Sequence, residues 1–431
     1  MTSLTFKGPG QFLGALVPPG DKSISHRALL FGALSEGLSV YENFLESEDC
    51  LCLLNVLRMM GVEIEKQPGS TTVSVRGVGL GGLKPPSKEL YLGNSGTAMR
   101  LLLGVLAGQH FEASLTGDPS LSSRPMRRVT DPLKQMGARI KGKENANFAP
   151  LTIRGGNLRG IDFNNKLASA QVKSALLFAG MFAEGETKIL EPVASRDHTE
   201  RFLRASGAKF KQDGPLLVIE KSDRLSPFQT KIPGDISSAA FFITGAAMTE
   251  GSNVLVKDVG LNPTRTGILQ VLKRMGAEIE VTVTQEIPEP MGEIRVKGGR
   301  LHRTEIAREE IPALVDELPV LMVAMSLAEG ESLISGAEEL RVKETDRIRS
   351  MVHNLKRVGA SIEELPDGCL VKGVSELQGG VVQSFGDHRT AMSLAVASLR
   401  SRGEIVVEGT DCIATSYPVF EQHFSHLLKL R

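Results

Sequence analysis

One sequence pattern recurs six times along the 431 residues: an apolar, helix-like run, a turn glycine and then a strand-like run. The copies read FGALSEGLSVYENF, GVLAGQHFEASLTG, LLFAGMFAEGETKILEP, FITGAAMTEGSNVLVKDV, VAMSLAEGESLISGA and AVASLRSRGEIVVEG. Their turn glycines are Gly37, Gly108, Gly185, Gly251, Gly330 and Gly403. A spacing of roughly 70 residues is too long for a solenoid repeat and fits a small α/β unit. The pattern therefore predicts a chain built from six such units.

A second pattern follows five of the six turns: MMGVEIE, QMGARIK, ASGAKFK, RMGAEIE and RVGASIEE. Each reads as an amphipathic helix that ends at Gly, with an alternating strand behind it. We expect each unit to hold one almost wholly apolar helix and one amphipathic helix. A helix that is apolar on all sides is buried, so the six apolar helices should form the interior of two three-unit domains, with the amphipathic helices outside.

Two nearly identical stretches, PGDKS at residues 19–23 and PGDIS at residues 233–237, indicate where the domains divide. Three units lie between them and three follow. We predict one domain at residues 21–232 and another made of residues 1–20 plus 233–431, so that the chain crosses twice. The ligand is expected in the cleft between the two domains.

The composition excludes several classes of partner. Lys plus Arg and Asp plus Glu number 50 each, so no overall positive field attracts nucleic acid or an anionic membrane. Tryptophan is absent, and the four scattered cysteines match neither a disulfide framework nor a metal site. The start of the chain has no signal-peptide pattern, and no apolar run reaches the ~20 residues that span a bilayer. We expect a cytoplasmic protein that binds small molecules and needs no metal.

The entries of the apolar helices carry more Arg and Lys than structure requires. These side chains are Lys22, Arg27, Arg100, Arg124, Arg127, Arg128, Lys173, Arg196, Lys343, Arg347 and Arg389. Several stand near a helix N-terminus, where a cation opposes the helix dipole unless an anion binds. Arg suits carboxylate or phosphate groups, and a desolvated Lys can also transfer a proton. The pattern indicates substrates that carry several negative charges.

Acidic residues lie among these cations, at Asp316, Glu317, Glu344, Asp346 and Asp387. For each, a helix cap or an ion-pair partner is as good an interpretation as a catalytic role. Asp316 is the best candidate for proton transfer because it opens an almost purely apolar helix, where desolvation and cations can tune a carboxylate. His26 and His388 could titrate, but a histidine in so tight a motif more often serves as a structural donor.

Six motifs carry a resemblance that covers essentially the whole chain: DKSISHRALL, LGNSGTAMR, SRPMRRVTDPL, SAQVKSALL, LRVKETDRI and GDHRTAMS. Together they resemble the 5-enolpyruvylshikimate-3-phosphate synthase family (3-phosphoshikimate 1-carboxyvinyltransferases). The resemblance implies an α/β protein of two similar domains, each with three repeated βαβαββ units around buried parallel helices, an inside-out α/β barrel. It also implies a monomer of the shikimate pathway that closes over shikimate 3-phosphate and phosphoenolpyruvate (PEP) without any cofactor.

Matched motif by motif, the resemblance assigns residues to each substrate. Shikimate 3-phosphate is expected to contact Lys22, Ser23, Arg27, Ser169, Gln171, Arg196, Asp316 and Lys343. PEP is expected to contact Lys22, Gly96, Arg124, Gln171, Glu344, Arg347 and Arg389. The implied catalytic residues are Asp316, as base for the 5-hydroxyl, and Glu344 or Lys22, as proton donor to C3 of the enol.

The sequence departs from some members of the family. The run Ser169-Ala170-Gln171 lacks a serine that one form has, and Thr415 stands where another form has a lysine. SAQ, SRDHTE and IATSYP resemble the second bacterial class, many of whose members tolerate glyphosate, whereas Gly96 is the residue of the sensitive class. We expect sensitivity, because a methyl group at position 96 is what crowds this inhibitor in tolerant relatives.

Two other functions fit parts of the pattern. A UDP-N-acetylglucosamine enolpyruvyl transferase shares the six-unit fold, but its flexible loop usually carries a reactive cysteine, and GDPSLSSRPMRR has none. A non-catalytic polyanion-binding protein would not need Lys22, Asp316 and Glu344 beside the binding arginines. Phosphate release with each acceptor distinguishes the three.

Overall fold

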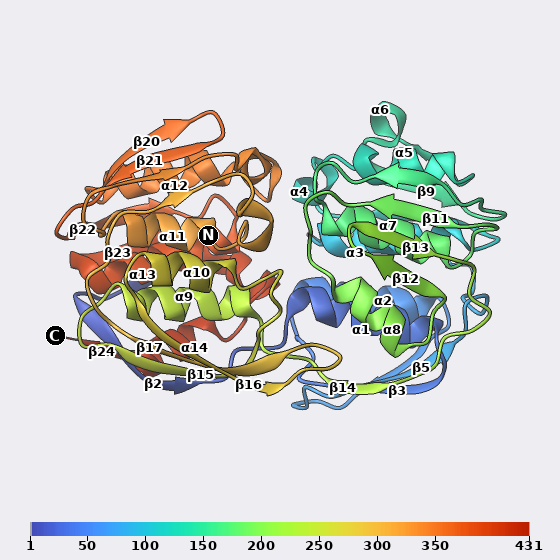
Figure 1. The fold of residues 1–431 in the computed structure, drawn as a ribbon, viewed down its shortest axis with the longest axis horizontal. Coiled ribbons are helices and arrows are strands. Elements are labelled where there is room, and N and C mark those ends of the chain that lie inside the picture. The colour runs from blue at the N-terminus through green and yellow to red at the C-terminus, as the bar shows by residue number, and fades with distance from the viewer. Residues whose placement is uncertain (1, 431) are drawn as a thin grey trace. The chain divides into compact units, whose positions relative to one another are not determined.

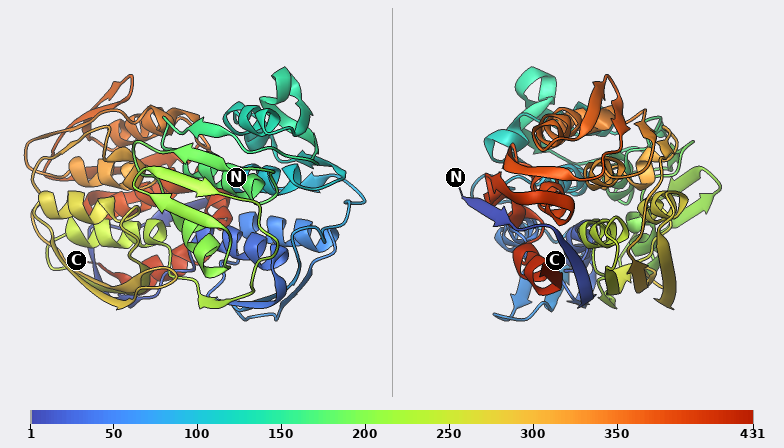
Figure 2. Two further views of the ribbon diagram at one scale, coloured as in Figure 1. Left: turned by 45° about the vertical axis from the view of Figure 1, so that its right-hand side comes forward. Right: turned by 90° about the vertical axis from the view of Figure 1, so that its left-hand side faces the viewer.

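A computed structural model describes residues 2–430 and divides the chain into two compact units. Gly20–Ile232 form one, here called the central unit. The chain up to Pro19 and from Pro233 onward forms the other, the terminal unit. Each unit has its own buried apolar core. Figure 1 shows the fold, and Figure 2 shows it from two further directions.

Three inner helices form the middle of each unit, with sheets outside them (Figure 1). In the central unit they are α1 (Lys22–Leu34), α3 (Gly96–Ala107) and α7 (Ala170–Gly180). In the terminal unit they are α9 (Ile236–Ala247), α11 (Leu318–Met325) and α13 (His388–Ala397). Every residue of α9, α11 and α13 is buried. The six predicted apolar helices and their burial are confirmed.

Outer helices accompany the inner ones. They are α2 (Glu48–Met59), α5 (Arg127–Gln135), α8 (His198–Ala205), α10 (Gly267–Arg274), α12 (Arg347–Arg357) and α14 (Phe420–Leu427), with the short α4 (Pro119–Ser122) and α6 (Lys143–Ala146) beside α5. Five of them are followed by a glycine with positive φ, as predicted: Gly61, Gly137, Gly207, Gly276 and Gly359. Helix α14 was not predicted, because it runs directly into a strand without a glycine.

The central unit holds three four-stranded sheets, in the orders β14-β3-β5-β4, β6-β7-β9-β8 and β10-β11-β13-β12. Their strands are β3 (Glu36–Glu42), β4 (Glu63–Lys66), β5 (Val73–Val78), β6 (Leu90–Tyr91), β7 (Glu112–Thr116), β8 (Arg139–Gly142), β9 (Phe148–Arg154), β10 (Asp162–Asn164), β11 (Thr187–Leu190), β12 (Phe210–Asp213), β13 (Leu216–Ile219) and β14 (Gln229–Lys231). In each sheet the first two strands are parallel and the others antiparallel.

The terminal unit also holds three sheets, of five, four and three strands, in the orders β16-β17-β15-β2-β24, β18-β19-β21-β20 and β1-β23-β22. Its strands are β1 (Ser3–Phe6), β2 (Gly10–Leu16), β15 (Asn253–Gly260), β16 (Glu278–Gln285), β17 (Met291–Lys297), β18 (Glu305–Ile306), β19 (Glu331–Ile334), β20 (Ser361–Leu365), β21 (Gly368–Lys372), β22 (Leu377–Gln383), β23 (Ser401–Glu408) and β24 (Leu428–Leu430). The N-terminal strand β1 pairs antiparallel with β23 and so completes the last sheet.

Two of the six repeats exchange a strand. In four repeats, the strand before the inner helix pairs in parallel with the strand after it: β6 with β7, β10 with β11, β18 with β19 and β22 with β23. At the two points where the chain passes from one unit to the other, this partner is different. Strand β2, which precedes α1, pairs with β15, and β14, which precedes α9, pairs with β3. The terminal unit therefore contains the strand that precedes α1 of the central unit. The central unit contains the strand that precedes α9 of the terminal unit.

No helix within residues 2–430 is long and apolar enough to cross a membrane.

The contact between α3 and α7 yields a stability prediction. A Cβ at Gly104 of α3 would lie 2.2 Å from the backbone oxygen of Ala175 in α7. Gly104→Ala should therefore lower the free energy of unfolding by about 1–3 kcal/mol, since the two backbones must separate. Gly81→Ala is the control, because nothing lies within 4 Å of its Cβ position. Denaturant unfolding of both variants tests the contact, and an equal loss in both would contradict it.

Candidate active site

The N-terminal turns of the three inner helices of the central unit are joined by side-chain hydrogen bonds. His26 Nε2 of α1 lies 3.0 Å from Ser95 Oγ, at the entry of α3. Arg100 of α3 donates to Gln171 Oε1 of α7 over 2.6 Å, and Gln171 Nε2 donates to Thr97 Oγ1 over 2.9 Å. The polar entries that the sequence places far apart thus meet in one region of this unit.

Side-chain caps secure five of the six inner helices. The capping residues are Asp21, Ser95, Ser169, Asp235 and Asp387. Helix α11 is the exception, because its N-cap Glu317 makes no capping bond. Asp316 lies in the turn before Glu317 and does not open the helix, which corrects the expectation from sequence. Pro319, in the first turn of α11, has no N–H group, so this turn has one fewer backbone donor that needs a capping partner.

Lys22 and Arg124 are both held by short polar side chains. Lys22 Nζ lies 3.1 Å from Asp49 Oδ2, which is buried at the start of α2. Arg124 donates to Asn94 Oδ1 and, over 3.2 Å, to Ser120 Oγ. The sequence analysis missed Asp49 and Asn94. The available signal for Asp49 was its position as an acid in the first turn of an amphipathic helix. An acid at such a position is ordinarily explained as a helix cap.

Gly96 leaves space beside two arginines at the entry of α3. A Cβ at this position would lie 3.0 Å from Arg100 Nη1 and 3.3 Å from Arg124 Nη1. The missing side chain lets both guanidinium groups approach the first turn of the helix, where the free N–H groups also favour an anion.

Arg27 is almost fully enclosed, with 2% of its surface exposed. Its Nε donates to Thr199 Oγ1 over 2.7 Å, Nη2 to Ser174 Oγ over 2.8 Å and Nη1 to the backbone oxygen of Ser23 over 2.9 Å. The guanidinium group therefore ties α1 to α7 and α8.

Lys173 does not face a ligand, although it was grouped by sequence with the helix-entry cations that are expected to bind anionic substrates. Its ammonium group is buried and lies 2.7 Å from a carboxylate oxygen of Glu191 and 2.7 Å from one of Glu200. The sequence could not show this, because both glutamates lie on later elements. Burial raises the pKa of Glu200, and the neighbouring Lys173 opposes that shift.

Arg347 is the centre of the candidate site in the terminal unit. Its Nε lies 2.7 Å from Asp387 Oδ2, Nη1 lies 3.1 Å from Asp316 Oδ1 and Nη2 lies 2.6 Å from Glu344 Oε2. Only 1% of the Arg347 side chain is exposed. Burial by itself would lower the pKa of Arg347, but Asp387, Glu344 and Asp316 raise it above its ordinary value. One arginine thus holds two predicted catalytic-site carboxylates beside each other.

Two further cations lie close to Asp316. Arg389 Nε is 3.7 Å from Asp316 Oδ1, and its Nη1 donates to the backbone oxygen of the same residue over 3.2 Å. Lys343 Nζ is 3.6 Å from Glu339 Oε1. Burial lowers the pKa of Lys343 below its ordinary value, against the opposing effect of Asp316. Arg347 and Arg389 thus both contact the same carboxylate oxygen of Asp316.

Thr415, which replaces the lysine of one form of the family, lies at the entry of α13. Its Oγ1 donates to the backbone oxygen of Cys412 over 2.7 Å and lies 3.5 Å from His388 Nδ1. The position is thus adjacent to the residue that precedes Arg389.

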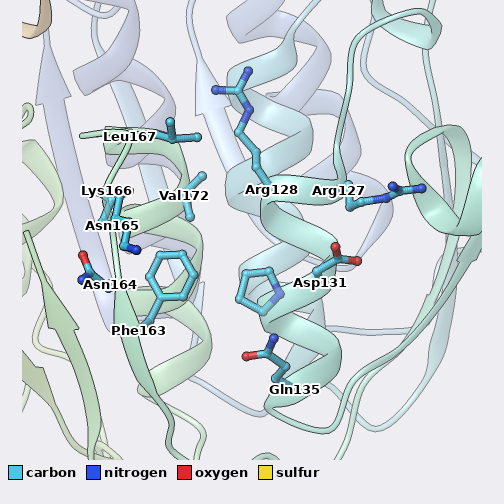
Figure 3. A pocket seen from close by; sticks show the side chains of 11 residues that line it. Arg127, Arg128, Asp131, Gln135, Phe163, Asn164, Asn165, Lys166, Leu167 and Val172 are labelled. Atoms are coloured by element: carbon cyan, nitrogen blue, oxygen red, sulfur yellow. The ribbon is translucent and has the colours of Figure 1, made fainter.

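A pocket of about 410 Å³ lies in the central unit, between α5 and the segment that joins β10 to α7 (Figure 3). Phe163 and Val172 line one side of it and Asp131 and Gln135 the other (Figure 3). Arg127 and Arg128, which the sequence analysis grouped with the helix-entry cations, line this pocket. None of the predicted substrate contacts lines it, but Asn165, which does, is hydrogen-bonded to the backbone of Ser169.

Comparisons with known proteins identify the family of the chain. A model of the family "EPSP synthase (3-phosphoshikimate 1-carboxyvinyltransferase)" matches residues 6–424. The chain belongs to this family. The 3-phosphoshikimate 1-carboxyvinyltransferase of Pelotomaculum thermopropionicum is 52% identical over 94% of each chain, and that of a Sulfurihydrogenibium species is 47% identical over 99% of each. The resemblance drawn from the six motifs is confirmed.

Solved structures support the EPSP synthase fold. The EPSP synthase of Acinetobacter baumannii matches with a TM-score of 0.87 and 43% identity, covering 99% of each chain. The enolpyruvyl transferase NikO of Streptomyces tendae matches with a TM-score of 0.80 at 17% identity, covering 100% of this chain and 98% of its own, and so shows the shared fold alone. The predicted fold class is confirmed. Within residues 2–430, no group of three His, Cys, Asp or Glu side chains could hold a metal ion.

His26 yields a prediction on pH dependence. Its two ring nitrogens contact the backbone oxygen of Lys22 at 2.7 Å and Ser95 Oγ at 3.0 Å, which confirms the structural role expected of it. Burial lowers the pKa of His26 to about 4. Between about pH 6.5 and pH 4 the unfolded chain binds a proton that the folded chain does not, so acidification should remove up to about 3 kcal/mol of stability.

Denaturant unfolding at pH 4, 5 and 6.5 measures this effect. His26→Gln should flatten the dependence, since the group that titrates only in the unfolded chain is gone. His110→Gln, at an exposed position, should leave it as in the unaltered chain. The same pH dependence in His26→Gln as in the unaltered chain would assign it to other groups.

Proposed function

We propose that this chain transfers the enolpyruvyl group of PEP to the 5-hydroxyl of shikimate 3-phosphate, with release of phosphate. The reaction belongs to the shikimate pathway, which leads to chorismate and the aromatic amino acids. Membership of the EPSP synthase family over residues 6–424 and relatives at about half identity support this activity. The observation that carries it is the Arg347 cluster, where Asp316 and Glu344 contact one buried guanidinium group.

Both units contribute to binding in this proposal. The acceptor, shikimate 3-phosphate, is bound by Lys22, Ser23, Arg27, Ser169, Gln171, Arg196, Asp316 and Lys343. The donor, PEP, is bound by Lys22, Gly96, Arg124, Gln171, Glu344, Arg347 and Arg389. Both substrates carry phosphate and carboxylate groups, which suit the forked guanidinium of Arg and the free N–H groups at helix entries.

The reaction needs two proton movements. A bond forms between the acceptor O5 and C2 of PEP while C3 gains a proton, which gives a tetrahedral intermediate. C3 then loses a proton and the bond from C2 to the phosphate oxygen breaks. Asp316 takes the proton of the 5-hydroxyl, and Glu344 or Lys22 delivers a proton to C3 and later removes one. The arginines stabilise the negative charge of the departing phosphate.

The contacts of Asp316 fit the role of base. Arg347 and Arg389 both contact its Oδ1, and these two contacts fix the orientation of the carboxylate. Arg347 also holds Glu344, so that a second carboxylate lies close to the first.

Phosphate release by the purified chain tests the proposal. Shikimate 3-phosphate with PEP should release phosphate, and UDP-N-acetylglucosamine with PEP should not. Release with the nucleotide sugar would assign the chain to the related transferase. Release with neither acceptor, together with binding of shikimate 3-phosphate, would leave a polyanion-binding protein.

Asp316→Asn tests the assigned base. The amide can still hydrogen bond to a hydroxyl but cannot take its proton, so kcat should fall about 10²- to 10⁴-fold while the Kd of shikimate 3-phosphate changes little. Steady-state phosphate release and calorimetric titration measure the two quantities. Asp223→Asn, at an exposed carboxylate paired with Lys209, is the control and should change neither. An active Asp316→Asn enzyme would remove Asp316 from the role of base.

A further inference from the structure

We propose that Glu191 and Asn165 are positioning residues that hold Ser169 and Arg196 in place for the phosphorylated acceptor. The proposal rests on the function proposed above, in which both held residues bind shikimate 3-phosphate. Neither Glu191 nor Asn165 belongs to the predicted contacts. Both are buried within the central unit, with 7% and 3% of their surface exposed.

Asn165 fixes the turn that carries Ser169. Its Oδ1 accepts from the backbone nitrogen of Ser169 over 3.2 Å, and its Nδ2 donates to the backbone oxygen of Ser169 over 3.3 Å. Between them lies Ala168, whose φ of +47° is unfavourable for a residue with a side chain. Such a conformation persists only where the surroundings enforce it, and both backbone groups of Ser169 are bound to one amide.

Glu191 connects this turn to the loop that carries Arg196. One oxygen, Oε1, accepts from Asn165 Nδ2 over 2.9 Å and from Ser195 Oγ over 2.6 Å. Ser195 directly precedes Arg196 in the chain. A single carboxylate oxygen therefore links the residue that holds Ser169 to the neighbour of Arg196.

Lys173 anchors this carboxylate from the other side. Its Nζ contacts Glu191 Oε2 at 2.7 Å and also donates to the backbone oxygen of Ser195 over 3.3 Å. Lys173 lies on α7, one turn after Ser169, and its own backbone nitrogen donates to the Ser169 oxygen over 3.0 Å. Groups buried in a low dielectric hold one another in a narrow geometry, so the anchor limits the movement of both loops together.

Glu200 is the comparison for Glu191, because it pairs with Lys173 but holds no loop in the described part of the chain. It contacts the same ammonium group at 2.7 Å and is as deeply buried, yet its second oxygen has no hydrogen-bond partner among the described residues. Glu191 therefore does two things, pairing with Lys173 and holding two loops, whereas Glu200 does only the first. A neutral amide at position 200 still leaves one carboxylate for the one ammonium group.

The test compares Glu191→Gln, Asn165→Ala and Glu200→Gln in full-length enzyme, with phosphate release as the assay. We expect the first two to raise KM for shikimate 3-phosphate about tenfold, with smaller changes in kcat and in KM for PEP. Asn165→Ala removes the amide that holds Ser169, and the amide in Glu191→Gln must turn its N–H donors either toward the Lys173 ammonium or toward the donors of Asn165 and Ser195. Glu200→Gln should leave KM for shikimate 3-phosphate unchanged. Thermal unfolding of each variant reports any loss of stability separately.

Equal KM values for Glu191→Gln and Glu200→Gln would overturn the proposal, because the cluster would then act through stability alone. Unchanged KM in Asn165→Ala would overturn it too, and this variant decides the matter if Glu191→Gln does not fold, since it keeps the Lys173 ion pairs. Unaltered enzyme that releases no phosphate would instead refute the proposed function, and this inference with it. The two failures are therefore distinguishable.

Discussion

The structure depends on burying six helices that are apolar on nearly every side. Such a helix can place polar groups only at its ends, where the first backbone N–H groups lack partners within the helix. Five of the six inner helices meet this need with a side-chain cap, while arginine and lysine gather around the same entries. Side-chain hydrogen bonds join the entries of α1, α3 and α7, so the first N–H groups of these three helices and their polar partners lie in one region. The candidate site follows from the packing.

Lys173 in the central unit and Arg347 in the terminal unit are two buried cations that contact several carboxylates each. Such pairing is expected, because an unpaired buried charge is strongly unfavourable. Lys173 is enclosed by Glu191 and Glu200, and its cluster joins two loops. Arg347 contacts Asp316, Glu344 and Asp387, and two of these remain partly exposed. In the function proposed here, the first cluster positions two loops and the second transfers protons, and Asp316 and Glu344 of the second are the more exposed carboxylates.

The exchanged strands fix where the chain passes from one unit to the other. Strand β2 completes the sheet that follows α9, and β14 completes the sheet that follows α1. The Pro-Gly-Asp stretches lie directly after these strands, and their aspartates cap α1 and α9. The chain passages between units therefore end at helix entries, so the same short segments set both the topology and the position of Lys22 and Ser23.

The sequence by itself determined the six repeats, the inner helices and the family, because burial and turn glycines leave periodic signals and the motifs are contiguous. It could not separate Lys173 from Lys22, since both are lysines near an apolar helix entry. It also missed Asp49, Asn165 and Glu191. Their roles depend on partners that only the tertiary structure brings within hydrogen-bond distance: Asp49 meets Lys22, and Glu191 meets Lys173 and Ser195. Local pattern fixes which segments are buried, whereas the pairing of buried charges is decided by packing between distant segments.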